Sequence, residues 1–383
     1  MTHPDPAALL HGLESAGRQV VLVATGGGAA ALSQLVGIPG ASSVVLEGLV
    51  PYARPAMDEL LGGPQETYCS ARAARRLAMA AWQRARDLGA DAPRAMGAAV
   101  TAGLRTRQPK RGAHRVHVAV QTLTATQVVS LELDKDARSR AEEEGLAATL
   151  LLAAVAAADQ GDIELPPGLL RPGEEVVAER VEATPSWQAL LAGPQAAALA
   201  AGPVDAVPEP GGLVFPGSFD PLHEGHLLMA RVAEEIAERP VAYELSITNV
   251  DKPALDYAEI RDRAAQFAPR ALWLTRAATF LEKIAIFPES TFVMGADTFV
   301  RLADPRYYQG SREAARDAVR TIARRTRGLI VFGRVRDGVF LDAAQLDVPK
   351  ELREVAYFVS EREFRLDISS TALRRDALAA VEA

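Results

Sequence analysis

The chain has 383 residues, 49% hydrophobic and 24% charged, with a net charge of −7 at pH 7 and a pI near 5.6. That length exceeds one typical core, so we expect two domains, and the acidic balance argues against nucleic acid or an anionic membrane as a partner. The single cysteine, Cys69, excludes an internal disulfide. Because there is neither a recognisable signal peptide nor a run of about 20 apolar residues, we expect a cytoplasmic protein.

The first 158 residues alternate strand-like and helix-like segments, and we expect them to form one domain. Apolar runs predict strands at 20–24, 43–46, 98–102 and 116–122, and helical spacing predicts helices at 29–35, 71–88 and 139–157. This alternation is typical of an α/β layer fold.

A glycine-rich turn after the first strand has two interpretations. Gly26-x-Gly28-x-x-Ala31 fits the dinucleotide fingerprint, with Glu47 about 20 residues further on as the ribose-binding carboxylate. The second interpretation rests on Thr-Gly-Gly-Gly at 25–28, Ile-Pro-Gly-Ala-Ser at 38–42, Gly-Leu-Val-Pro-Tyr at 48–52, Asp-Glu-Leu-Leu-Gly at 58–62 and Thr-Ala-Gly at 101–103. Through these motifs residues 10–157 resemble the CinA-like, or nicotinamide-nucleotide amidohydrolase, family.

Three positions depart from what that resemblance implies. Thr25 stands where the family's amidohydrolases place a nucleophilic serine, Met57 where they place a lysine, and Ala99 where a hydroxyl residue is normal. A hydroxyl nucleophile needs a nearby base, and methionine cannot be one, although Glu47 or Asp58 could compensate. We therefore expect amidohydrolase activity to be lost and the domain to serve in dimerisation or regulation; the alternative is a working hydrolase built on Thr25.

Residues 159–211 are rich in proline, glycine and alanine, which predicts a connector rather than a core. Within it, Trp187 is expected to fix one short helix onto a domain. The second domain then covers residues 212–383.

The second domain opens with the most informative stretch of the chain. Apolar residues 213–215 predict a strand, and the Pro, Gly and Ser residues that follow predict a turn. Apolar residues then recur every four positions, which predicts a helix that begins near His223 and His226. The unpaired N–H groups at a helix start attract phosphate oxygens, and imidazoles can donate hydrogen bonds while charge builds on a transferred phosphate. The turn residues expected to contact a nucleotide are Gly217, Ser218 and Phe219, with the glycine permitting close approach.

The pattern His-x-Gly-His after Gly-Ser-Phe-Asp-Pro resembles the nucleotidyltransferase superfamily with that signature, and most closely the nicotinate/nicotinamide mononucleotide adenylyltransferases. The resemblance implies a Rossmann-like, doubly wound parallel sheet. A second signature, Ile-Ser-Ser-Thr-x-x-Arg, follows about 145 residues later. The hydroxyls and amides of Ser369, Ser370 and Thr371, at another helix start, would bind an anion. Arg374 can bind β- and γ-phosphates.

Two further segments match the resembled family. A lysine in the loop after the second strand steadies the phosphates there, and Lys252 is the matching residue; the alternative is a solvated loop lysine. Arg261 and Arg263, in the helix that follows, are expected to be surface charges, or one of them faces the nucleotide.

Gly-Ala-Asp-Thr at 295–298 resembles the corresponding segment of the adenylyltransferases. Gly295 permits close approach of a ligand, and Asp297 can accept hydrogen bonds from ribose hydroxyls, cap a helix, or do both. The family often has a tryptophan here that stacks on the pyridine ring; in this chain Tyr307 or Tyr308 is the candidate.

Together these residues predict transfer of AMP from ATP to nicotinate or nicotinamide mononucleotide, with release of pyrophosphate. The expected phosphate-binding residues are His223, His226, Lys252 and Arg374. Mg²⁺ is expected to enter with ATP, with no metal site of the protein's own. The alternatives are a cytidylyltransferase, a pantetheine-phosphate-type adenylyltransferase, a non-catalytic pyridine-nucleotide sensor, and a bifunctional amidohydrolase/adenylyltransferase. Expected partners are ATP and a small mononucleotide, and a second copy of the chain bound through the first domain.

Overall fold

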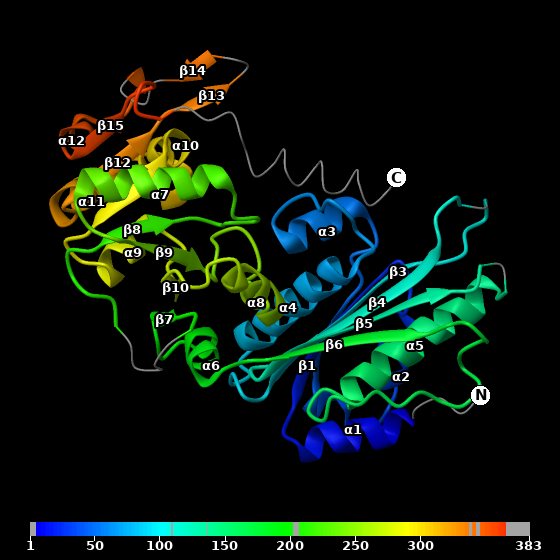
Figure 1. The fold of residues 1–383 in the computed structure, drawn as a ribbon. Helices are drawn as coiled ribbons and strands as arrows, with labels where there is room; N and C mark the ends of the chain where they lie inside the picture. The colour runs from blue at the N-terminus through cyan, green and yellow to red at the C-terminus, as the bar shows by residue number, and fades with distance from the viewer. Residues whose placement is uncertain are drawn as a thin grey trace. The chain divides into compact units, whose positions relative to one another are not determined.

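The computed structural model describes residues 5–108, 110–135, 137–201, 207–336, 339–341 and 345–364 (Figure 1). Contacts divide the chain into two compact units. The first unit is Met1–Thr184 together with Asp251–Glu259, and the second is Pro185–Val250 together with Ile260–Ala383. A short segment from within the second half of the chain therefore belongs to the first unit.

The first unit is built on a mixed sheet in the order β2-β1-β3-β4-β5-β6. The strands are β1 (Gln19–Thr25), β2 (Val45–Leu49), β3 (Ala95–Gly103), β4 (His114–Gln121), β5 (Ala125–Leu133) and β6 (Val176–Glu182). The helices are α1 (Pro6–Ser15), α2 (Ala30–Val36), α3 (Arg54–Leu61), α4 (Ala71–Asp87) and α5 (Arg140–Ala156). Strands β1, β2 and β3 run parallel, whereas β3 to β6 pair antiparallel. The α/β layer fold expected from the sequence is confirmed.

Helices cover both faces of this sheet. Alternate residues of β3, among them Met96 and Ala98, join the apolar core formed with α1, α2 and α5. Gly97, between them, faces α4, where a Cβ atom would lie only 2.0 Å from the carbonyl oxygen of Ala78. The strand therefore needs glycine at this position, because the backbone of α4 approaches it directly.

The predicted connector is not a bare linker. It contains β6, which pairs with β5, then α6 (Pro185–Ala192) and β7 (Ala197–Leu199), which pairs antiparallel with a strand of the second sheet. Trp187 lies in α6 and is buried, as expected for a residue that fixes this helix to a domain. Residues 159–211 therefore supply an edge strand to each sheet, and the contacts place the boundary at Thr184 and Pro185.

The second unit has a sheet in the order β15-β12-β11-β8-β9-β10-β7. Its strands are β8 (Leu213–Pro216), β9 (Val241–Ser246), β10 (Leu272–Thr275), β11 (Thr291–Gly295), β12 (Gly328–Phe332) and β15 (Ala356–Val359), parallel throughout, with β7 antiparallel at one edge. A short hairpin, β13 (Arg334–Arg336) and β14 (Val339–Leu341), follows β12. Counted along the chain, the parallel strands have the spatial order 6-5-4-1-2-3, which is the Rossmann order. The predicted Rossmann-like fold is confirmed.

Helices lie on both faces of the second sheet. They are α7 (Glu224–Ala237), α8 (Tyr257–Ala265), α9 (Phe280–Ile286), α10 (Ala296–Arg301), α11 (Arg312–Arg325) and α12 (Lys350–Glu354). Val214 of β8 joins a core with residues of α9, α10 and α11. Its neighbour Phe215 points to the opposite face and stacks on Tyr243 of β9, with ring centroids 5.8 Å apart. The sheet is therefore doubly wound.

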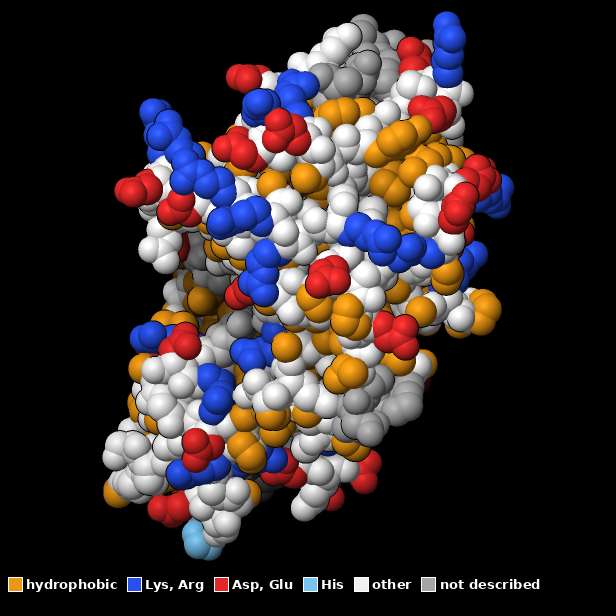
Figure 2. All heavy atoms as spheres, turned by 90° about the vertical axis from the view of Figure 1, so that its left-hand side faces the viewer, with side chains coloured by type: hydrophobic (Ala, Val, Ile, Leu, Met, Phe, Trp, Pro, Cys, Tyr) orange, Lys and Arg blue, Asp and Glu red, His pale blue; other side chains and the backbone are white. Residues whose placement is uncertain are grey.

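Charges of both signs are interspersed on the face shown in Figure 2, with hydrophobic side chains between them. On α11 the exposed residues alternate in the same way, as Arg312, Glu313, Arg316 and Asp317 illustrate. Within the described part of the chain, no helix combines the length and the apolar composition that crossing a bilayer requires.

Candidate functional site

The strand order of the second sheet marks where a ligand would bind. Strands β8 and β11 are neighbours, and the chain winds in opposite directions from them, so the sheet's topological switch point lies between them. Their pairing covers two positions, Leu213 with Thr291 and Val214 with Phe292. Beyond these, the chain leaves β8 through Gly217 and enters α10 after Gly295. Ligands of open α/β sheets bind at such carboxyl ends, so both predicted glycines stand at the expected place.

The loop after β8 folds back on its own aromatic side chain. A Cβ atom on Gly217 would lie 2.6 Å from the ring of Phe219, so glycine is required for this turn. Phe219 itself has a left-handed φ of 45°, which costs free energy in a residue other than glycine. The sequence assigned Gly217 to close approach of a ligand, but in the structure the close neighbour is a side chain of the same loop.

Phe219 is fully buried and is the centre of an aromatic cluster. Its ring meets Phe267 at 5.0 Å, His226 at 5.1 Å and Tyr243 at 5.6 Å between centroids, each nearly edge to face. Such aromatic pairs are favourable beyond their buried area and fix ring orientation. The Phe219 side chain thus holds the loop against the sheet and against His226. Its predicted contact with a nucleotide stays a prediction.

His223 and His226 lie together at the start of α7. His223 is the N-cap residue with extended backbone, and the two rings stack with centroids 3.8 Å apart. The backbone N–H of His223 donates a hydrogen bond to Nδ1 of His226, at 3.3 Å. Because Nδ1 accepts, the proton of a neutral His226 is assigned to Nε2, which makes Nε2 a hydrogen-bond donor.

The same pair is kept uncharged by its surroundings. Burial and the neighbouring His223 lower the pKa of His226 to about 4, and burial also lowers the pKa of His223. Both imidazoles are therefore neutral near pH 7 in the absence of an anion. A phosphate beside them would favour the protonated forms and raise both pKa values.

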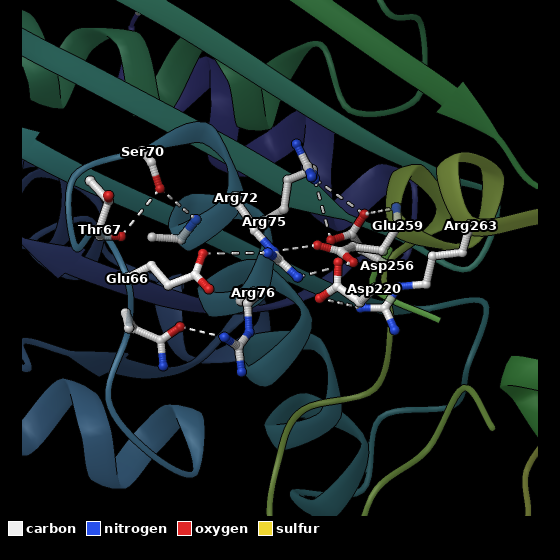
Figure 3. A network of polar contacts seen from close by, with 12 residues as sticks. Glu66, Thr67, Ser70, Arg72, Arg75, Arg76, Asp220, Asp256, Glu259 and Arg263 are labelled. Carbon is white, nitrogen blue, oxygen red and sulfur yellow. Dashed lines mark hydrogen bonds and ion pairs between the residues drawn. The ribbon is translucent and has the colours of Figure 1, made fainter. Parts of the chain in front are cut away.

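Helix α8 and the residue that follows it, Gln266, hold the loop at both ends. Arg263 donates from Nη1 to the carbonyl oxygen of Ser218 at 2.9 Å, and its Nη2 lies 3.5 Å from Oδ2 of Asp220 (Figure 3). One turn further, Oε1 of Gln266 accepts a hydrogen bond from the backbone N–H of Leu222 at 2.8 Å. The surface role expected for Arg263 is wrong, because the residue is buried. No sequence pattern could find this role, since its main partner is a backbone carbonyl 45 residues away.

The residues predicted after β11 have mixed outcomes. No described atom lies within 4 Å of where a Cβ on Gly295 would be, so packing within the described residues does not require the glycine. Asp297 is the second residue of α10, whose N-cap is Gly295, so the alternative role of Asp297 as N-cap is wrong. Asp297 is exposed, which leaves its carboxylate accessible to a ribose. That contact stays a prediction.

Tyr307 and Tyr308 lie in a 3₁₀ turn, Pro305–Tyr308. The hydroxyl of Tyr308 donates to the carbonyl oxygen of Leu302 at 2.8 Å, and burial raises its pKa. This bond ties Tyr308 to the end of α10. Tyr307 is therefore the better candidate of the two for stacking on a base.

The remaining phosphate-binding candidates lie outside the described residues or in a segment of the first unit. Ser369, Ser370, Thr371 and Arg374 lie outside the described residues. Lys252 is exposed and lies in Asp251–Glu259, the segment that belongs to the first unit. The contacts of these five residues with phosphate stay predictions. The part of the chain that the structure describes contains no group of three or more His, Cys, Asp or Glu residues arranged to hold a metal ion.

In the first unit, Thr25 and Met57 are neighbours. The hydroxyl of Thr25 donates to the carbonyl oxygen of Pro51 at 2.9 Å and lies 3.5 Å from Sδ of Met57. Thr25, Met57 and Ala99 are all buried. A hydroxyl that donates its hydrogen bond to a backbone carbonyl, beside a thioether, has no base to activate it as a nucleophile.

The two carboxylates that could replace the missing base have other partners. Glu47 pairs with Arg84 of α4, Oε2 to Nε at 2.8 Å. Asp58 accepts a hydrogen bond from the hydroxyl of Tyr68 at 2.7 Å. The Glu47–Arg84 pair also counts against the dinucleotide interpretation of the glycine turn, because Arg84 already binds the carboxylate that this interpretation assigns to a ribose.

The glycines of that turn are required by the protein's own packing. A Cβ on Gly26 would lie 1.9 Å from the carbonyl oxygen of Ala102, and one on Gly28 would lie 2.7 Å from the side chain of Val100. Both have left-handed φ angles, 73° and 83°. The neighbouring strand thus explains these glycines without a bound dinucleotide.

Comparison with known proteins finds two family matches, one in each half of the chain. Residues 7–155 match the family described as the CinA C-terminal domain, and residues 214–376 match the family described as cytidylyltransferase-like. The chain joins a CinA-like domain to a cytidylyltransferase-like domain. The second match supports nucleotidyltransferase activity in general, and the resemblances inferred from the sequence motifs are confirmed at this level. No curated protein matches the chain.

Solved structures that resemble the chain include CinA proteins. A CinA superfamily protein from Escherichia coli is 18% identical, with 39% of this chain and 84% of that chain covered and a TM-score of 0.33. A competence/damage inducible protein from Agrobacterium tumefaciens is 23% identical, with 42% and 99% covered and a TM-score of 0.32. One from Enterobacter asburiae is 19% identical, with 40% and 98% covered and a TM-score of 0.34.

Proposed function

We propose that the cytidylyltransferase-like domain transfers AMP from ATP to the phosphate of a mononucleotide, and that the acceptor is nicotinate or nicotinamide mononucleotide. An oxygen of the acceptor phosphate attacks the α-phosphorus of ATP in line. The bond between that phosphorus and the oxygen bridging to the β-phosphate breaks, and pyrophosphate leaves; Mg²⁺ bound to ATP would offset the charge on the phosphates. The product is a dinucleotide joined by a new phosphoanhydride bond.

The protein's part in this reaction is positioning and charge stabilisation. The N-terminus of α7, with its positive dipole end, favours phosphate oxygens, and neutral His226 offers an Nε2–H donor in the same place. Donors fixed before the reaction stabilise the charge that develops on the transferred phosphoryl group without reorganising. No side-chain nucleophile is needed, because the acceptor phosphate is itself the nucleophile.

The single observation that carries this proposal is the position of the His-x-Gly-His helix at the topological switch point of a Rossmann-ordered sheet. Lys252 and Arg374 are proposed to neutralise the β- and γ-phosphates. The choice of a pyridine mononucleotide rests on the fusion to a CinA-like domain, whose family resemblance points to pyridine nucleotides, and is therefore an argument by association.

The test crosses donors with acceptors. Pyrophosphate release is measured with ATP or CTP against nicotinate mononucleotide, nicotinamide mononucleotide and phosphopantetheine, and the mass of the joined product is determined. The proposal expects turnover with ATP and a pyridine mononucleotide. Turnover with CTP or phosphopantetheine would replace the substrates but keep the reaction class. Nucleotide binding without any turnover would favour the pyridine-nucleotide sensor.

For the CinA-like domain we propose that amide hydrolysis is lost and that the domain forms a homo-oligomer. The contact of the Thr25 hydroxyl with the Pro51 carbonyl and the Met57 thioether favours this over a working hydrolase. Ammonia release from nicotinamide mononucleotide would revive the bifunctional enzyme. A monomeric mass by light scattering would refute the oligomer.

A further inference from the structure

The segment Asp251–Glu259 lies within the stretch that matches the cytidylyltransferase-like family, yet its contacts place it in the first unit. The backbone N–H of Ala254 donates to Oε1 of Gln83 on α4, and that of Tyr257 donates to Oγ1 of Thr126 on β5, both at 3.0 Å. The Tyr257 hydroxyl donates to the carbonyl oxygen of Leu123 at 2.6 Å. Ala254 and Tyr257 are both buried, so the segment is a packed part of the first unit.

Two ion pairs fix Asp256 and Glu259 of this segment to α4. Oδ1 of Asp256 lies 3.2 Å from Nε of Arg75, with side chains that are 1% and 11% exposed. Oε1 of Glu259 lies 2.6 Å from Nε of Arg72. Figure 3 shows both arginines directed toward these carboxylates from the same helix.

The Arg75–Asp256 pair is the stronger constraint because it is buried. Burial raises the pKa of the Asp256 carboxyl, and the Arg75 guanidinium lowers it. Asp256 also accepts the backbone N–H of Glu259 at 3.0 Å, which ties the pair to the first turn of α8. Removing one partner would leave a buried charge uncompensated, whereas replacing both with apolar side chains of similar size would not.

Helix α8 begins in this segment and continues past Glu259 into the second unit. Arg263 near its end, and Gln266 directly after it, hold the loop that precedes His223, through Ser218 and Leu222. The segment also carries Lys252, the proposed phosphate-binding lysine. One continuous stretch of chain therefore joins the buried ion pair, the proposed lysine and the residues that hold the loop.

We propose that Arg75 and Asp256 are positioning residues for nucleotidyl transfer: the CinA-like unit fixes the segment Asp251–Glu259, and with it Lys252 and the start of α8. This inference rests on the proposed function of the second unit. It gives the CinA-like domain a role that needs no chemistry of its own.

The experiment uses four variants of the full chain: Arg75→Met, Asp256→Leu, the double variant of these two, and Glu174→Gln as matched control. Glu174 forms another buried ion pair of the first unit, with Arg138, at side-chain exposures of 2% and 7%. Two quantities are measured well below the unfolding temperature: the kcat and ATP KM of pyrophosphate release, and deuterium uptake by the backbone of residues 251–259.

The single variants are expected to lose about 10-fold to 100-fold in kcat/KM, because small displacements of binding groups have effects of that size. Deuterium uptake in residues 251–259 rises in the same variants. The apolar double variant recovers both quantities toward the unsubstituted protein, and Glu174→Gln changes neither. Recovery of kcat/KM in the double variant would show that the pair acts by positioning the segment and that its charges are not themselves required.

Two results would overturn the inference alone: unchanged kcat/KM in Arg75→Met, or an equal loss in Glu174→Gln, which would reduce the effect to general destabilisation. Failure of the unsubstituted protein both to turn over and to bind ATP would instead refute the proposed function, and this inference with it.

Discussion

The backbone N–H of His223 donates to Nδ1 of His226 at 3.3 Å, so one histidine of the pair sets the tautomer of the other. The neutral His226 is left with Nε2–H as its donor, at a helix start where anions are already favoured. The spacing therefore has a structural reason: His223 is the N-cap of the helix, and its backbone orients the ring of His226.

The lowered histidine pKa values predict how stability depends on pH. His226 and His117 both have a pKa of about 4 in the folded chain against an ordinary 6.5, chiefly because of burial. Between these values the unfolded chain binds more protons, so stability is full above about pH 6.5 and is lost as the pH falls toward 4. Urea midpoints measured from pH 7 to 4.5 should show a shallower loss for His117→Gln. Parallel curves would contradict the prediction.

Substituting alanine for two glycines should separate folding from binding. Gly217→Ala forces a methyl group against the Phe219 ring, and we expect a loss of about 1–3 kcal/mol in unfolding free energy. Gly295→Ala meets no described atom within 4 Å, so its stability should change by less than about 0.5 kcal/mol. Its affinity for ATP, measured by calorimetry, should fall roughly tenfold. Unchanged ATP binding would remove Gly295 from the site.

Arg263→Met should lower kcat/KM about 10-fold to 100-fold, because the carbonyl of Ser218 loses its donor and the loop is no longer fixed. Arg261→Met is the matched control on the same helix. Arg261 is exposed and pairs with its neighbour Asp262 at 2.6 Å. Equal kinetics of the two variants would show that the loop does not depend on Arg263.

Thr25→Val tests the proposal that the first unit has lost amide hydrolysis. Loss of the hydroxyl leaves the carbonyl of Pro51 without this donor, and we expect a destabilisation of about 1 kcal/mol with pyrophosphate release unchanged at low temperature. The unsubstituted chain and the variant should release ammonia from nicotinamide mononucleotide equally slowly, at the buffer rate. Thr25-dependent ammonia release would contradict the loss of hydrolysis.

The candidate site could be predicted from the sequence where its residues lie close together in the chain. The turn at 217–221 and the histidines are consecutive in the chain, and a strand, a turn and a helix start leave a readable pattern. The contacts of Arg263 and Asp256 could not be predicted, because their partners, Ser218 and Arg75, are 45 and 181 residues distant in the chain. Strand β6 was hidden by the proline- and glycine-rich composition around it, although pairing with β5 makes it part of the sheet.

The central claim is that the start of α7 stabilises the phosphoryl group in transfer. The most direct test is kcat/KM for pyrophosphate release from ATP and nicotinamide or nicotinate mononucleotide in His226→Ala, with His117→Ala as a control that removes an equally shifted histidine from the other unit. The account predicts a loss of about 100-fold or more in His226→Ala and none in His117→Ala. Equal activity of His226→Ala and the unsubstituted chain would contradict it.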